Sequence, residues 1–171
     1  GECSYYIDCP AKMGVVQVNG DGVFLIDSGN DKEAGKKVQK LLDQNGWRLL
    51  AILNTHSNAN HIGGNKLLQE RTGCSIYAPG MEAAFTRWPC LEPSFLYGGY
   101  PPKALRNKFL MAQPSGVQDL SELPLPAGME ILPLPGHFFD MVGVKTPDGV
   151  WFLADCLSGA AIVEKYHVNF I

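Results

Sequence analysis

The amino-acid sequence predicts an α/β fold with some antiparallel pairing, and three observations lead to that class. Apolar runs that suit buried strands alternate with amphipathic stretches that suit helices over residues 13–78. This alternation favours parallel strands joined by helices. Residues 141–155 instead form a strand–turn–strand pattern around Pro-Asp-Gly, which is typical of an antiparallel hairpin. With 171 residues, 46% of them hydrophobic, the chain can bury one ordinary core, so we predict a single domain over residues 1–171.

Glycines and prolines mark the ends of the expected elements. The glycines of the NGDG turn suit a tight hairpin near the start of the chain. A helix with early acidic residues and later lysines ends at Gly46, where a C-cap is expected. The expected strands are residues 13–20, 23–29, 47–55, 74–79, 128–136 and the two arms of the hairpin at 141–155. The expected helices are residues 30–46 and 60–72, with a further helix-like start after residue 156.

Residues 88–128 differ from the rest, because seven prolines interrupt every long element there. We interpret this stretch as an insertion or long loop, with one short helix around residues 103–111. A loop of this length is usually functional or mobile. Five aromatic residues in or beside this stretch could wall a substrate pocket or could only pack the loop onto the core. They are Phe85, Trp88, Phe95, Tyr97 and Tyr100.

Charge and cysteine content limit the kinds of partner. The net charge is −3 with no basic block, so we expect neither nucleic acid nor a membrane as partner. The apolar runs are also far too short to span a bilayer. The five cysteines are odd in number and show no C-x-x-C spacing, which favours reduced thiols in a cytoplasmic protein.

Potential metal ligands stand at the ends of three expected strands. His56 and His61 follow the strand at 47–55, His137 follows the strand at 128–136, and Asp155 ends the final hairpin. In open α/β sheets, ligands gather beyond the carboxyl ends of strands. Imidazole and carboxylate groups that converge at such an edge predict a metal site.

Four motifs in this order resemble those of the metallo-β-lactamase superfamily, the fold shared by zinc β-lactamases and glyoxalase II. They are VFLIDSG, THSNANHIGGN, PGH and LADCL, and the resemblance covers nearly the whole chain except the proline-rich middle. The resemblance implies a four-layer αββα sandwich, here truncated after the strand that carries the bridging aspartate. It places a metal site at the edge of the sandwich. The short remainder after Asp155 would leave one sheet edge exposed, so we expect self-association there.

The resemblance also assigns roles to individual residues. The implied metal ligands are His56, Asn58, His61, His137 and Asp155. The implied catalytic positions are Asn60 and His61. Asp27 is expected to support the histidines through hydrogen bonds. For Cys156, a small buried residue is the favoured interpretation, and a supporting role beside the metal is the alternative.

The sequence departs from the family pattern in three places. Asn58 stands where the family has histidine, and Asn60 stands where it has aspartate. A late histidine ligand is absent, and His167 lies too near Asp155 by family spacing to replace it. Since a structural zinc site is worth roughly 10–16 kcal/mol, one lost ligand costs on the order of 3 kcal/mol, or about a hundredfold in affinity. Asn60 also has a simpler interpretation, as the N-cap of the following helix.

These departures leave three alternatives for the metal and three for the function. We expect at most one zinc ion, with iron as the alternative metal and an empty site as the third case. The first function is a metal-dependent hydrolase of small ester, thioester or lactam-type substrates, with weakened activity. The second is an inactive family member that binds a small molecule or a protein partner. The third is a mononuclear iron redox enzyme, so whether the chain is an enzyme stays open.

Overall fold

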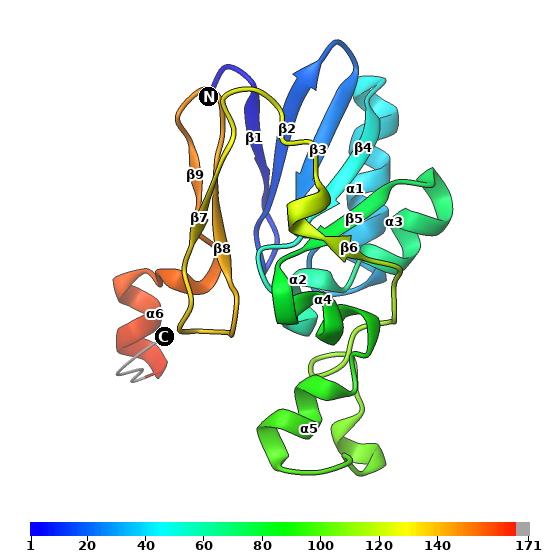
Figure 1. The fold of residues 1–171 in the computed structure, drawn as a ribbon, viewed down its shortest axis with the longest axis vertical. Coiled ribbons are helices and arrows are strands. Elements are labelled where there is room, and N and C mark those ends of the chain that lie inside the picture. Colours follow the sequence, from blue (N-terminus) through cyan, green and yellow to red (C-terminus); the bar gives the residue numbers. More distant parts are fainter. Residues whose placement is uncertain (167–171) are drawn as a thin grey trace.

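Two β-sheets form the centre of the molecule in the computed structural model, which describes residues 1–166 (Figure 1). The first sheet has the order β1-β2-β3-β4-β5-β6, with antiparallel pairs up to β3 and parallel pairs from β3 to β6. Its strands are β1 (Ser4–Ile7), β2 (Met13–Asn19), β3 (Gly22–Ile26), β4 (Arg48–Leu53), β5 (Ser75–Ala78) and β6 (Gln118–Asp119). The second sheet is antiparallel and comprises β7 (Glu130–Pro133), β8 (Val142–Lys145) and β9 (Trp151–Phe152).

Helices lie on the outside of the six-stranded sheet and along its lower edge (Figure 1). The α-helices are α1 (Lys32–Asn45), α2 (Ala59–Ile62), α3 (Asn65–Thr72), α4 (Gly80–Arg87), α5 (Leu91–Tyr97) and α6 (Ala160–Tyr166). Three 3-10 turns are η1 (Lys103–Leu105), η2 (Leu120–Glu122) and η3 (Ala154–Cys156). Asp31 caps α1 by accepting from the amides of the first turn, and Gly46 ends it in the left-handed conformation.

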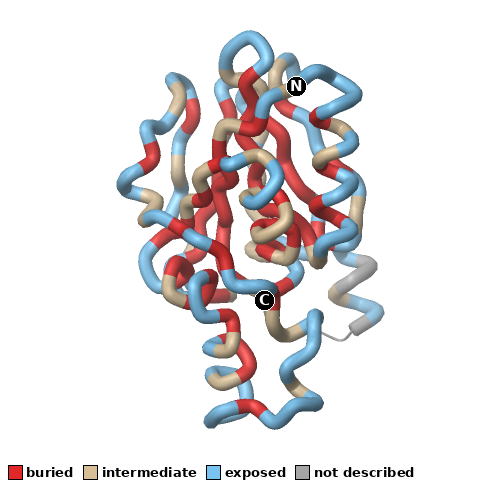
Figure 2. Tube along the Cα trace, turned by 90° about the vertical axis from the view of Figure 1, so that its right-hand side faces the viewer, coloured by how far each residue is buried: buried red, intermediate tan, exposed pale blue. Residues whose placement is uncertain are grey.

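Alternate residues of the central strands fill two separate apolar layers. Val23 and Leu25 of β3 face the layer beneath α1 and α3, whereas Phe24 and Ile26 face the layer shared with β8. All five residues of β3 are buried, which explains its continuous apolar run. Figure 2 shows this buried interior against the exposed segment at the lower end. The architecture is therefore an α+β sandwich of two sheets with helices outside, as the sequence predicts.

The predicted helix over residues 60–72 is wrong in one respect, because it is broken into α2 and α3 at Gly63 and Gly64. A Cβ atom at Gly63 would lie 2.3 Å from the carbonyl carbon of Asn30, and one at Gly64 would lie 2.4 Å from the oxygen of Ser28. The two glycines thus let backbone pack on backbone. Asn60 is also not the N-cap, since it lies within α2.

The proline-rich stretch contains more helix than the sequence predicts. The short helix expected at 103–111 is wrong, because only the 3-10 turn η1 forms there. Instead α5 begins at Leu91 with Pro93 in its first turn, where the missing N–H of proline is not needed. Helix α4 precedes it and is a further element that the sequence does not predict. Among residues 1–166, no helix combines the length and apolar character needed to cross a membrane.

Candidate metal centre

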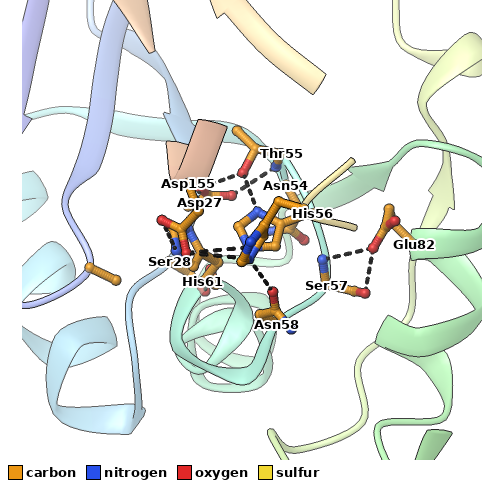
Figure 3. Close-up of polar contacts among 12 residues, drawn as sticks. Asp27, Ser28, Asn54, Thr55, His56, Ser57, Asn58, His61, Glu82 and Asp155 are labelled. Carbon is orange, nitrogen blue, oxygen red and sulfur yellow. Dashed lines mark hydrogen bonds and ion pairs between the residues drawn. The ribbon is translucent and has the colours of Figure 1, made fainter. Parts of the chain in front are cut away.

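The polar residues of the candidate site gather around the segment that follows β4 (Figure 3). The segment from Asn54 to Ser57 is almost entirely buried, although every residue in it is polar. Asn54 is held by reciprocal amide contacts with Asn65 of α3, at 2.8 and 3.4 Å. Because buried polar groups are costly without partners, this segment depends on a dense hydrogen-bond network.

Asp27 is the centre of that network and orients both histidines of the loop. It accepts from the backbone N–H of Thr55 at 2.8 Å and from the Thr55 hydroxyl at 2.7 Å. It also accepts from Nδ1 of His61 at 2.8 Å. Since the Thr55 hydroxyl donates to Asp27, its oxygen must accept from Nδ1 of His56 at 3.0 Å. Both rings therefore carry hydrogen on Nδ1 and present Nε2 to the site, as a metal requires.

Three side chains converge on one point and form what we call the three-ligand cluster: His56, His137 and Asp155. Their candidate ligand atoms all lie within 4.8 Å of one another. Oδ2 of Asp155 is 3.9 Å from Nε2 of His56 and 3.6 Å from Nε2 of His137. These separations are too long for hydrogen bonds and suit atoms that share an ion.

The protonation of the histidines follows from their surroundings. Burial and the neighbouring His61 lower the pKa of His56 to about 3, so this ring is neutral. Its Nε2 is buried and has no hydrogen-bond partner among the described residues. An orphaned acceptor on a neutral imidazole fits a metal ligand, and the donor set of two histidines and a carboxylate fits zinc or iron.

His61 has the opposite character. Burial would lower its pKa, but Asp27 and Asp155 outweigh burial and raise the pKa to about 10. Its Nε2 lies 3.2 Å from Oδ1 of Asp155. Burial alone would likewise raise the pKa of Asp155, yet the contact and charge of His61 lower it to about 2. His61 is therefore protonated on both ring nitrogens, and a metal ion that bound its Nε2 would have to displace the proton there.

Asn58 joins the site through its amide group. Its Oδ1 lies 3.0 Å from Nε2 of His137, and its Nδ2 donates to Glu92 at 2.8 Å. The other oxygen of Glu92 accepts from the backbone N–H of Ala59 at 2.9 Å. Burial raises the pKa of Glu92 to about 7, against the lowering effect of these two donors.

A second buried glutamate supports the same loop from α4. Glu82 accepts from the backbone N–H and the hydroxyl of Ser57, and its other oxygen accepts from the backbone N–H of Asp140. Burial raises its pKa, while the hydrogen bonds from Ser57 lower it. Asp140 in turn accepts from the N–H of Met81, which ties the segment after His137 to α4.

The sequence analysis missed Glu82 and Glu92. Each stands alone among apolar residues near the start of a helix, in GMEAAF and CLEPSF. A lone acid inside an apolar stretch was the available signal, because buried carboxylates are rare unless they are paired.

The other predicted positions lie in different settings. Asn60 is exposed and lines a cavity of about 490 Å³ together with His61 and Asp155. Cys156 is only partly buried and packs against the cluster of Phe85, Phe138 and Met141. His167 falls outside the described residues.

Aromatic residues border the site on the side of His137. A recess of about 230 Å³ is lined by Phe95, Gly136, His137, Phe138 and Phe139. Phe85 stacks edge-to-face on Phe95 and Phe138 behind this recess. The other aromatic residues of the proline-rich stretch are exposed: Trp88, Tyr97, Tyr100 and Phe109.

A two-sheet sandwich with a cluster of histidine and carboxylate side chains at its edge is the arrangement of the metallo-β-lactamase type. A sequence profile described as the Metallo-beta-lactamase superfamily matches residues 6–154. The chain therefore belongs to the metallo-β-lactamase superfamily.

Individual relatives agree with this assignment. A probable metallo-hydrolase, YybB of Bacillus subtilis, is 29% identical over 142 residues, which cover 80% of this chain and 60% of that protein. A hydroxyacylglutathione hydrolase of Methylococcus capsulatus is 44% identical over 46 residues, which cover 27% of this chain and 18% of that protein. The chain thus matches less than two thirds of the length of either relative.

Solved structures share the fold. BJP-1, a subclass B3 metallo-β-lactamase of Bradyrhizobium japonicum, superposes with a TM-score of 0.66 at 20% identity. The match covers 96% of this chain and 67% of that one. At this identity the similarity supports the sandwich fold alone.

Proposed function

We propose that the chain is a metal-dependent hydrolase of small ester, thioester or lactam-type substrates that works with a single metal ion. The observation that carries the proposal is the three-ligand cluster, whose ligand atoms lie within 4.8 Å of one another and include the unpartnered Nε2 of the neutral His56. Three protein ligands leave a position open for water or substrate. A divalent ion held there would polarise a carbonyl group and lower the pKa of bound water.

Residues of the chain would orient the metal ligands, orient the attacking water and supply a proton. Asp27 keeps Nε2 of both loop histidines directed into the site, directly for His61 and through Thr55 for His56. Asn60 lines the cavity where the family has an aspartate, and its amide oxygen can orient water but cannot take up its proton. For this reason we expect the activity to be weak. His61 borders the same cavity and offers Nε2 as a proton donor to a leaving group.

The shape of the site supports a small substrate with an apolar part. The cavity beside Asn60 and His61 measures about 490 Å³, within the range of small-molecule sites. On the other side of His137, the phenylalanine-lined recess offers an apolar surface. A substrate with its carbonyl group near the three-ligand cluster could place an acyl or aromatic group in that recess.

The first test is the metal content of protein purified without chelator or affinity metal, followed by hydrolysis assays. We expect about one equivalent of zinc or iron, and slow turnover of chromogenic thioesters, lactones or β-lactams. Because Asp155→Asn removes a ligand, it should lower metal affinity about a hundredfold and remove the metal-dependent rate. The surface variant Asp21→Asn is the matched control and should leave both unchanged.

A second variant tests the assignment of the two asparagines. Asn58→His and Asn60→Asp together restore two of the three missing family ligands, so we expect tighter metal binding and a higher zinc content. Unchanged metal content in this double variant would contradict our mapping of the site.

A second candidate function is that of a binding protein without catalysis. Asn60, which replaces the residue that would take up a proton, favours this alternative. Metal-loaded protein that hydrolyses none of the substrates yet binds them would support it. Oxygen-dependent turnover with iron would instead favour a mononuclear redox enzyme, since two histidines and a carboxylate are also an iron ligand set.

A further inference from the structure

Glu92 is a buried carboxylate whose two oxygens each accept one hydrogen bond from residues 54–59, the segment after β4 that we call the metal loop. One oxygen accepts from Nδ2 of Asn58 at 2.8 Å and the other from the N–H of Ala59 at 2.9 Å. The residue is only 6% exposed. A buried glutamate with no cationic partner in these contacts is costly, so its presence calls for a role.

The contact with Glu92 determines which end of the Asn58 amide faces the site. An asparagine amide has a donor end and an acceptor end, and a carboxylate can only accept. With Nδ2 committed to Glu92, Oδ1 must point the other way, and it lies 3.0 Å from Nε2 of His137. Oδ1 is therefore directed at the three-ligand cluster, where the family has an imidazole nitrogen.

We propose that Glu92 is a positioning residue that fixes the Asn58 amide, so that its carbonyl oxygen acts as a fourth ligand beside the three-ligand cluster. This inference rests on the proposed function, because it assumes that the cluster binds a metal ion. Asn58 thereby compensates in part for the missing histidine. The resulting set of two nitrogens and two oxygens is harder than the family set, which shifts relative affinity from Zn²⁺ towards Mn²⁺ and Fe²⁺.

Glu82 provides the matched comparison. It is another buried glutamate of the same region, and it holds Ser57, the residue directly before Asn58. Its contacts hold the backbone of the loop but do not involve the Asn58 amide. If Glu92 acted only by holding the loop in place, Glu82→Gln would affect metal binding in the same way as Glu92→Gln.

The test is a metal titration of five proteins, with Co²⁺ and Zn²⁺ competed against a chelator. The proteins are wild type, Glu92→Gln, Glu82→Gln, Asn58→Ala and the double variant Glu92→Gln with Asn58→Ala. A glutamine side chain in place of Glu92 has a single acceptor oxygen and could accept only one of the two hydrogen bonds. We therefore expect Glu92→Gln to weaken binding by about tenfold or more. In the Asn58→Ala background the same change should have no further effect, because the ligand that Glu92 positions is already gone.

Two readouts do not depend on catalysis. The visible absorption of bound Co²⁺ should differ between wild type and Asn58→Ala, because one oxygen donor is lost, and Glu82→Gln should keep the wild-type spectrum. In wild-type protein, the side-chain amide NMR signal of Asn58, assigned by its loss in Asn58→Ala, should shift when Zn²⁺ is added. The NMR measurement needs no Glu92 variant, so it holds even if Glu92→Gln does not fold.

Four results would overturn the inference. The first is that Glu92→Gln lowers metal affinity equally with and without Asn58. The second is that Glu92→Gln and Glu82→Gln lower metal affinity equally. The third is an Asn58 amide NMR signal that Zn²⁺ does not shift, and the fourth is wild-type metal affinity in Asn58→Ala. If wild type binds metal but Asn58→Ala binds it equally well, the inference fails and the proposed function stands. If wild type binds neither Co²⁺ nor Zn²⁺, both fail.

Discussion

At the residue scale, Asp27 shows how one carboxylate can orient two histidines, His56 and His61. It lies directly after β3 with a φ of +60°, a conformation that aspartate and asparagine tolerate better than most residues. From there it accepts from Thr55 and His61 and so controls the tautomer of both loop histidines. The sequence analysis expected this supporting role but not the relay through Thr55.

Asp27→Asn is expected to weaken metal binding without disturbing the backbone. Asparagine suits the left-handed conformation, but its Nδ2 would face the Thr55 hydroxyl and His61, where an acceptor is needed. The Thr55 hydroxyl would then donate to Nδ1 of His56, so that His56 would carry its hydrogen on Nε2 and could not bind a metal through that nitrogen. We expect at least about a tenfold loss of metal affinity, measured by chelator competition, with Asp21→Asn as the control. Unchanged affinity would contradict the control of His56 by Asp27 through Thr55.

At the element scale, the turn between α2 and α3 shows why two glycines follow the histidine motif. Gly64 packs against the carbonyl oxygen of Ser28, in the loop that also carries Asp27. This close approach brings the metal loop and the Asp27 loop together. The glycines therefore act through packing of backbone on backbone.

Gly64→Ala should destabilise the fold, because its Cβ would lie 2.4 Å from the Ser28 oxygen and the two loops would have to separate. We expect a loss of roughly 1–3 kcal/mol in the free energy of unfolding, measured by urea denaturation. Gly99→Ala is the matched control, since its Cβ would meet no atom within 4 Å, and it should change stability by less than about 0.5 kcal/mol. Equal effects of the two variants would contradict this account.

At the scale of the whole molecule, Asp148 links the two sheets at the end opposite the site. It lies in the β8–β9 turn and accepts from the backbone and hydroxyl of Ser4 in β1 and from the hydroxyl of Thr146. These hydrogen bonds, that from Ser4 above all, hold the pKa of Asp148 well below its usual range. The charged carboxylate therefore stabilises the folded state.

This link predicts a dependence of stability on pH. A carboxyl group with a lowered pKa stabilises the fold above its unfolded pKa of about 4 and loses that effect as the pH falls further. Asp148→Asn should unfold at lower urea than wild type at pH 7, and the difference should shrink below about pH 4. A difference that stays constant between about pH 7 and pH 3 would contradict an ionic origin.

The second sheet also suggests how copies of the chain could associate. Among the described strands β9 pairs only with β8, so its other side is an unpaired edge. We predict self-association along this edge, measured as a doubled mass by light scattering. A monomeric mass at high concentration would contradict the prediction, and a charged substitution such as Trp151→Lys should reduce association if it is correct.

The sequence by itself determined the main strands and helices of the first half and the histidines and aspartate that could bind a metal. These follow from local signals: apolar periodicity, the C-cap at Gly46 and a histidine motif at a strand end. The sandwich class came from the resemblance of four motifs to a known family. The break between α2 and α3 and the helix at Pro93 were decided by tertiary packing, because local propensity does not register a close backbone approach or a buried partner. The same holds for the site. The sequence identified Asn58 as a departure from the family, but only the structure placed Glu92 beside it, 34 residues away in the chain, where it orients the amide towards His137.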